Sequence, residues 1–131
     1  MHREFSIPAD VNVISDTVDE IVGFLREQGF AKGNEFAIEI SLREALANAV
    51  LHGCKNDRSK KINCVVECSH NHAVRIVVTD PGEGFDPDSL ADPLHSDNLH
   101  NDHGRGVYLI RQLMDSVEYA QGGREVRMTK S

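Results

Sequence analysis

Glu44, Asn48 and His52 are spaced four residues apart in REALANAVLHG, residues 43–53. On a helix, side chains four residues apart are neighbours, with Cβ atoms about 5–6 Å apart. Asn48 offers a neutral oxygen that suits Mg²⁺, and Glu44 offers a carboxylate that could take a proton from a hydroxyl or water. The alternative is a polar helix flank that faces solvent, with Glu44 paired to a Lys or Arg. We assign His52 no catalytic role and expect it to brace the helix end at Gly53.

A second candidate is DPGEGF, residues 80–85, which follows a strongly apolar strand. Asp80 at the end of that strand could present a hydrogen-bond acceptor to a ring amine. Gly82 and Gly84 permit positive φ and a close approach of the backbone to a ligand. The alternative is a plain turn, because Asp, Pro and Gly are common turn residues.

A third candidate is HGRGVYLI, residues 103–110, where Gly104 and Gly106 open an expected helix. Free backbone N–H groups and the helix dipole favour phosphate at such a position. Arg105 could add a charge-assisted contact. The alternative is a flexible entry to the helix.

Hydrophobic periodicity predicts the elements that must position these residues. Asn34 is the expected N-cap of the second helix, and Glu35 a favourable acid in its first turn. Alternation in the strands predicts a sheet with one buried face, which helices would cover: a two-layer α/β sandwich with an antiparallel or mixed sheet. The expected strands are 3–7, 62–68, 74–79, 117–120 and 125–129, and the expected helices are 11–28, 35–52 and one over 107–114, with a long loop over 80–106.

Composition restricts the class of protein. The 131 residues suit one domain, and 40% apolar with 27% charged residues is typical of a globular chain. A net charge of −7 argues against broad binding to nucleic acid or acidic membranes. We see neither a signal peptide nor a membrane span, and expect a cytoplasmic protein. The basic loop 55–61 is either solvated or a partner contact.

The three cysteines, Cys54, Cys64 and Cys68, give no complete disulfide framework. In a strand, Cys64 and Cys68 would lie about 13 Å apart, too far for an unstrained bridge. We expect small, buried, unpaired thiols, with metal ligation as the alternative.

The order of these features resembles the GHKL ATPase superfamily, which includes gyrase, histidine kinases and MutL. The shared pattern is a helical Glu-x-x-x-Asn, Asp-x-Gly-x-Gly after a strand, a long loop, and Gly-x-Gly opening a helix. The short length, NAVLHG and GRGVYLIRQLMD are similar to the anti-sigma-factor serine/threonine kinase branch. The resemblance covers nearly the whole chain. It implies the Bergerat ATP-binding fold in a single histidine-kinase-like ATPase domain, residues 1–131.

The resemblance also implies roles in binding ATP and Mg²⁺. Asn48 would ligate the Mg²⁺ that bridges the phosphates. Asp80 would accept a hydrogen bond from the adenine amino group, and Gly82 and Gly84 would shape the turn that follows it.

Further roles concern the phosphates and the transfer. Gly104, Arg105 and Gly106 would meet the phosphates, and residues 86–103 would form an ATP lid. Glu44 would be the general base that activates a serine hydroxyl on a protein substrate. For the histidines of this lid, a metal site is the alternative to solvated side chains.

The resemblance implies an anti-sigma factor that phosphorylates a STAS-domain anti-anti-sigma protein, binds a sigma factor and forms a homodimer. The alternative is a nucleotide-gated protein-binding regulator without kinase activity. One departure supports that alternative: the family usually has Thr after the glycine of the last hairpin, whereas Arg124 follows Gly123 here. Thr129 lies further along. This departure bears on nucleotide affinity and base selectivity.

Overall fold

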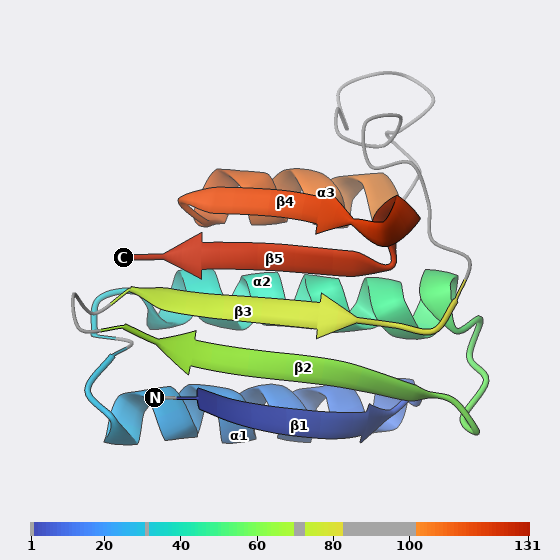
Figure 1. Ribbon diagram of the computed structural model, residues 1–131, viewed down its shortest axis with the longest axis horizontal. Helices are drawn as coiled ribbons and strands as arrows, with labels where there is room; N and C mark the ends of the chain where they lie inside the picture. The colour runs from blue at the N-terminus through green and yellow to red at the C-terminus, as the bar shows by residue number, and fades with distance from the viewer. Residues whose placement is uncertain (1, 31, 70–72, 83–101) are drawn as a thin grey trace.

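Five antiparallel strands form a single sheet with helices on one face (Figure 1). The computed structural model describes residues 2–30, 32–69, 73–82 and 102–131, without the side chains of 102–105. The strand order is β1-β2-β3-β5-β4, and each neighbouring pair is antiparallel. The predicted two-layer α/β sandwich is therefore confirmed. The strands are β1 His2–Pro8, β2 Lys61–Cys68, β3 Val74–Thr79, β4 Ser116–Ala120 and β5 Glu125–Lys130.

Alternating side chains of the strands build the core. One in-register row runs across the sheet through Phe5, Cys64, Val78 and Val126, and each of these side chains is buried. The residues between them along each strand point to the opposite face, as the period of two in a strand requires. The helices cover the buried face, so the core lies between the two layers.

The first helix begins with a 3-10 turn, Val11–Val13, and continues as α1, Ile14–Glu27. Asp10 starts this segment, because its Oδ1 accepts a hydrogen bond from the Asn12 N–H at 2.9 Å. The predicted helix over 11–28 is thus present with a tighter first turn.

The second helix, α2, spans Glu35–Asn48 and then widens into a π-helical turn, Ala49–Gly53. The prediction of a regular helix to residue 52 was wrong at this end. The Cys54 N–H donates to the carbonyl of Ala49, five residues back, at 2.8 Å. Such π turns are rare and occur often at functional sites.

The third helix, α3, spans Asp102–Leu113. It begins two residues before Gly104, so Gly104 and Gly106 lie within its first turns. The two glycines therefore open the helix as expected, whereas the expectation of a loop reaching residue 106 was wrong.

Asn34 stands at the N-cap position of α2 but makes no side-chain cap bond, contrary to prediction. Its Nδ2 instead donates to the carbonyl oxygen of Ser131 at 2.9 Å. The three cysteines are buried and form no disulfide with one another, as predicted.

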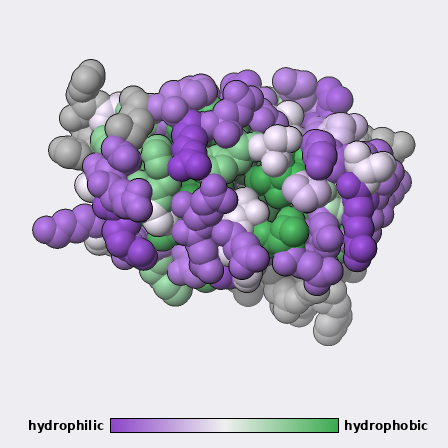
Figure 2. Space-filling view, turned by 90° about the horizontal axis from the view of Figure 1, so that it is seen from below, coloured by the Kyte–Doolittle hydropathy of each residue, from purple (hydrophilic) through white to green (hydrophobic). Residues whose placement is uncertain are grey.

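The edge formed by β1 and α1 is mostly hydrophilic, with hydrophobic side chains showing between the polar ones (Figure 2). Arg3 covers part of this edge. Its guanidinium lies 4.8 Å from the Phe5 ring centroid and 5.1 Å from that of Phe24, and it bonds Glu20 at 3.3 Å. A charged side chain on an edge strand discourages pairing with other strands.

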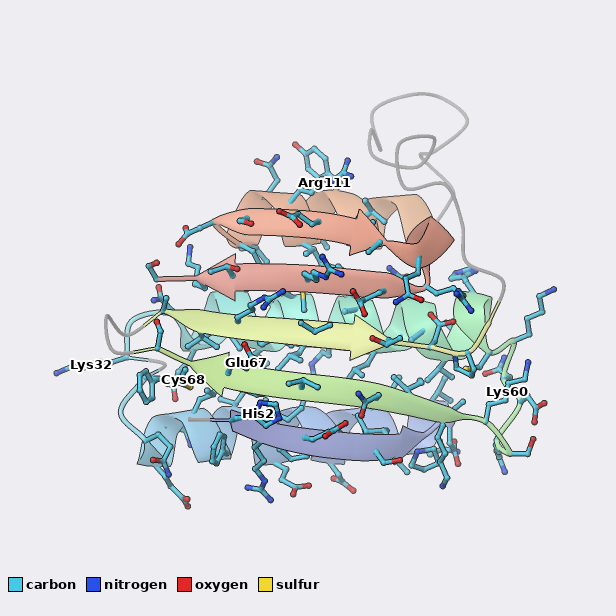
Figure 3. The ribbon with its side chains drawn as sticks, in the orientation of Figure 1. His2, Lys32, Lys60, Glu67, Cys68 and Arg111 are labelled. Atoms are coloured by element: carbon cyan, nitrogen blue, oxygen red, sulfur yellow. The ribbon has the colours of Figure 1, made fainter. Side chains whose placement is uncertain are left out.

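The face of the sheet away from the helices carries charged side chains (Figure 3). Glu67 lies there between His2, at 3.6 Å, and Arg75, at 3.7 Å. In the part of the chain that the structure describes, no helix has the length and apolar character needed to cross a membrane.

Candidate functional site

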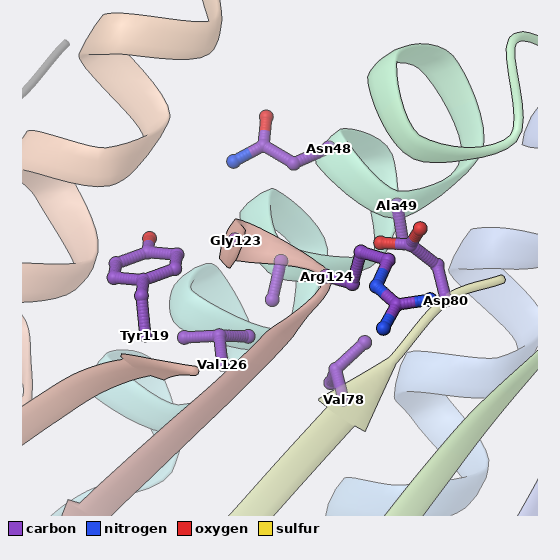
Figure 4. A pocket seen from close by; sticks show the side chains of 9 residues that line it. Asn48, Ala49, Val78, Asp80, Tyr119, Gly123, Arg124 and Val126 are labelled. Atoms are coloured by element: carbon purple, nitrogen blue, oxygen red, sulfur yellow. The ribbon is translucent and has the colours of Figure 1, made fainter. Parts of the chain in front are cut away.

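A pocket lies where β3 ends and β5 begins, beside the C-terminal end of α2 (Figure 4). It encloses about 290 Å³ with its open mouth included. Its walls are mostly small apolar side chains, with a few polar groups that converge on the space, a composition typical of ligand sites. The lining residues are Ala45, Asn48, Ala49, Val78, Asp80, Tyr119, Gly123, Arg124 and Val126.

Asp80 and Arg124 occupy the next row of the sheet after the last buried apolar pair. Val78 pairs with Val126 and Thr79 with Glu125, which places Asp80 opposite Arg124. The Asp80 N–H donates to the Arg124 carbonyl at 2.9 Å, so the pairing continues one residue beyond β3. Both side chains therefore fall on the inner face, where they end an apolar column with a carboxylate and a guanidinium.

Asp80 is a buried acid, with 8% of its surface exposed. Its Oδ1 accepts a hydrogen bond from the Gly82 N–H at 2.8 Å. Burial raises the pKa of Asp80, while the Gly82 N–H and the charge of Arg124 act in the opposite direction. A carboxylate has about four acceptor positions, so Asp80 retains capacity to accept from a ligand donor.

Two glycines pack directly against Asp80. A Cβ on Gly53 would lie 2.5 Å from the carboxylate of Asp80, and a Cβ on Gly82 would lie 1.8 Å from the carbonyl oxygen of Gly53. The π-helical turn thus brings the end of α2 onto the Asp80 turn. No side chain fits between them.

Glu44 and Asn48 meet the start of α3 at Gly106. A Cβ on Gly106 would lie 2.8 Å from Oε2 of Glu44 and 3.4 Å from Nδ2 of Asn48. The α2 residues expected to work together therefore lie side by side, and they face the Gly-x-Gly helix start. Asn48 also lines the pocket that contains Asp80.

Other predicted site residues lie partly or wholly outside the described chain. Gly104 and Arg105 belong to the first turn of α3, where backbone N–H groups lack helical partners; the Arg105 side chain is outside the description. Gly84 and residues 86–101 of the proposed lid also lie outside it, as does the histidine metal site. Among the described residues, no three His, Cys, Asp or Glu side chains gather as a metal site.

Sequence reasoning missed three contributors to this region. Gly53 was assigned only to the helix end, Tyr119 was given no role, and Arg124 was noted only as a departure from a family pattern. Burial raises the pKa of Tyr119 to about 12. Continuing the alternation of β3 and β5 by one step past each strand could have placed both Asp80 and Arg124 on the inner face, although not beside each other.

The fold and this site define a class of protein, and comparison with known proteins agrees. Residues 7–130 match the family model described as histidine kinase-like ATPase domain, so the chain belongs to this family. Within it, the chain is similar to serine-protein kinases named RsbW. The serine-protein kinase RsbW of Staphylococcus epidermidis is 30% identical over 97% of this chain and 84% of the relative.

Two further comparisons agree. The serine-protein kinase RsbW of Bacillus subtilis is 26% identical over 97% of this chain and 83% of that relative. A crystal structure of the RsbU and RsbW domains of a Mycobacterium tuberculosis protein superposes with a TM-score of 0.68 at 18% identity. That match covers 99% of this chain but only 31% of the longer protein, and it supports the fold alone.

Proposed function

We propose that the chain is an ATP-dependent serine/threonine-protein kinase that acts as an anti-sigma factor. It would transfer the γ-phosphate of ATP to a serine of a STAS-domain anti-anti-sigma protein. The observation that carries this proposal is the meeting of Glu44 and Asn48 at Gly106, beside the pocket that holds Asp80. A proton acceptor, a metal-binding amide and a buried base acceptor thereby share one region.

Asp80 is the proposed contact for the amine of the purine. Its carboxylate is buried, accepts a hydrogen bond from the Gly82 N–H and lies among small apolar side chains. A flat base with an exocyclic amine would contact Val78 and Val126 with its faces or edge and donate to Asp80. The close packing of Gly53 and Gly82 would hold that carboxylate in place.

The proposed position of the phosphates and Mg²⁺ is the start of α3, beside Asn48 of α2. When bound, Mg·ATP supplies the phosphoryl group and a cation that offsets the charge of the phosphates. Mg²⁺ in such sites takes one or two protein ligands together with phosphates and waters, which agrees with Asn48 as the proposed ligand. Gly106 leaves the space beside Asn48 free of a side chain.

Glu44 would act as the general base. It would take the proton from the substrate serine as the serine oxygen bonds to phosphorus and the bond to the ADP oxygen breaks. Gly104 and Arg105, at the start of α3, would contact the phosphates. We further propose that residues 86–103 form a lid over the nucleotide. The protein would form a homodimer, bind a sigma factor and be located in the cytoplasm.

The test is phosphate transfer from labelled Mg·ATP to a STAS-domain protein encoded near the gene for this chain. We expect label on one serine of that protein, and a loss of at least a hundredfold in Glu44→Gln. ATP binding should persist in Glu44→Gln and weaken strongly in Asp80→Asn. Transfer that survives in Glu44→Gln would exclude Glu44 as the base.

A second candidate function is a nucleotide-gated protein-binding regulator without kinase activity. Arg124 in the pocket wall favours it, because a charged side chain there changes how a base is held. Tight binding of Mg·ATP, with nucleotide-dependent capture of the partner and no transfer, would support this candidate over the kinase.

A further inference from the structure

The polar end of the base pocket consists of two groups of opposite character, Asp80 and Arg124. They face each other across the paired ends of β3 and β5, and directly opposed residues have Cβ atoms about 4.5–5.5 Å apart. Figure 4 shows the guanidinium of Arg124 and the carboxylate of Asp80 at the same side of the pocket. One group only accepts hydrogen bonds and the other only donates them.

Arg124 is held by its own turn, not by Asp80. Its Nε donates to the carbonyl of Gln121 and its Nη2 to Oε1 of Gln121, both at 3.2 Å. Gln121, Gly122 and Gly123 all have positive φ, at 54°, 68° and 90°, and this tight turn returns the chain so that Arg124 immediately precedes β5. Asp80 is bonded to Gly82. The carboxylate and the guanidinium thus both keep hydrogen-bonding capacity for a ligand.

The pocket leaves little room unless a side chain moves. Its cavity is about 20 Å³, which is room for about one water molecule, so a purine needs more space than this conformation offers. The apolar lining residues are buried on strands and a helix, and Asp80 is fixed by its turn. Arg124 is half-buried on a long stem, and its side-chain bonds are to an exposed turn. Arg124 is therefore the lining side chain best able to swing aside and then return onto the base.

We propose that Arg124 contacts the base and sets its selectivity, so that the pocket accepts guanine as well as adenine nucleotides. Adenine presents its amine to Asp80 and a ring nitrogen acceptor beside it. Guanine presents its N1–H to Asp80 and carries the O6 carbonyl beside it. A carboxylate without a neighbouring donor would repel O6. The Arg124 guanidinium donates to either acceptor, and Arg with guanine O6 is a favourable pairing in nucleic-acid recognition. This inference rests on the proposed nucleotide function.

The test measures binding of ADP, GDP and UDP with Mg²⁺ by calorimetry. The variants are Arg124→Met, which keeps a long side chain but removes the guanidinium, and Arg124→Lys, which keeps the positive charge. Arg127→Met is the matched control. Arg127 lies on β5 with its side chain on the face of the sheet away from the helices, and it pairs with Glu125 at 2.7 Å. Circular dichroism and thermal melting check that each variant is folded.

We expect ADP and GDP to bind the parent chain within about tenfold of one another, and UDP far more weakly. Arg124→Met should weaken GDP relative to ADP by about tenfold or more, Arg124→Lys should recover part of that ratio, and Arg127→Met should leave it unchanged. A parent chain that rejects GDP by more than a hundredfold overturns the inference. The inference is also overturned if neither Arg124 variant changes the ratio of ADP to GDP affinity. In that case Arg124 would affect the two nucleotides equally and would not set base selectivity. A parent chain that binds none of the three overturns the proposed function as well.

Discussion

Asp80 carries a charge where a charge is costly, because it is almost fully buried and accepts one backbone hydrogen bond. We predict that Asp80→Asn weakens ADP binding by about 10–100-fold, since a charged acceptor contributes about 1.5–3 kcal/mol to a hydrogen bond. Calorimetric titration of ADP measures the loss. Unchanged ADP affinity would remove Asp80 from the base site.

The same residue gives a prediction for pH. The folded pKa of Asp80 is raised by burial, so the folded state holds this proton more tightly than the unfolded chain. The contribution of Asp80 to stability is thus greatest below its ordinary pKa and is lost as pH rises through the raised pKa. Asp80→Asn should therefore be more stable than the parent at pH 7, with a smaller difference near pH 4. Thermal melting at both pH values checks this; a variant that is less stable at pH 7 contradicts it.

Gly106 is the point at which α3 approaches Glu44 and Asn48. In Gly106→Ala, the new methyl group would displace the Glu44 carboxylate, because the two would lie 2.8 Å apart. We predict at least a tenfold loss of phosphate transfer with a change in stability below about 1 kcal/mol, since the end of a Glu side chain can shift. Transfer rates and urea unfolding measure the two effects.

Gly23 provides the control, because it lies inside α1 and a Cβ there meets nothing within 4 Å. Gly23→Ala should stabilise the chain by about 0.5–1 kcal/mol through helix propensity and leave transfer unchanged. Equal transfer rates in both glycine variants would show that the Gly106 contact has no part in the reaction.

Among the secondary-structure elements, the π-helical turn Ala49–Gly53 depends on the turn after β3. Gly82→Ala would place a Cβ 1.8 Å from the Gly53 carbonyl oxygen, which is backbone and cannot rotate away. We predict a loss of about 1–3 kcal/mol in the free energy of unfolding, as in other overpacked sites, together with weaker ADP binding. Urea unfolding measures the loss of stability, with Gly23→Ala as the comparison. An unchanged free energy of unfolding in Gly82→Ala would mean that the π-helical turn can shift at no cost.

Most elements could be predicted from the sequence because their signals are local. The alternation in β2, β3 and β5 follows from one face being buried, and this fixed the layers as well. The π-helical turn could not be predicted, because the apolar pattern of α2 continues through Val50 and the widening comes from packing on Asp80. The start of α3 was missed because glycine is a poor helix former, and here contact with α2 overrides that preference.

The residues of the site could be predicted from the sequence, but not all of the contacts between them. Glu44 and Asn48 share a helix, so their spacing was sufficient to place them together. The Asp80–Arg124 pair depends on β5 lying between β3 and β4, an order that no local pattern contains. The role of Arg124 therefore required the three-dimensional register.

For the molecule as a whole, the three thiols should report global unfolding. Cys54, Cys64 and Cys68 are buried, and burial raises the pKa of Cys64 to about 12, so its reactive thiolate is scarce at pH 8. We predict slow reaction with a disulfide reagent in native conditions and rapid reaction of three thiols in denaturant. Native reaction should accelerate in parallel with unfolding measured by circular dichroism.

Cys54 offers a sharper comparison, because it is buried and follows Gly53, which packs against Asp80. If Cys54 reacts well before the other two, the region around Asp80 opens locally. ADP should then slow that thiol selectively. Reaction of all three at one rate, unaffected by ADP, would show that the molecule opens as a unit.

The pairing of Asp80 and Arg124 continues the rows of the core by one step, since Val78 and Val126 form the row before it. The pocket is, in effect, a layer of the hydrophobic core in which two side chains remain charged. A descendant that no longer needed its ligand could close this layer with apolar residues at these two positions and gain stability. Stability and ligand binding are therefore expected to oppose each other at these two positions.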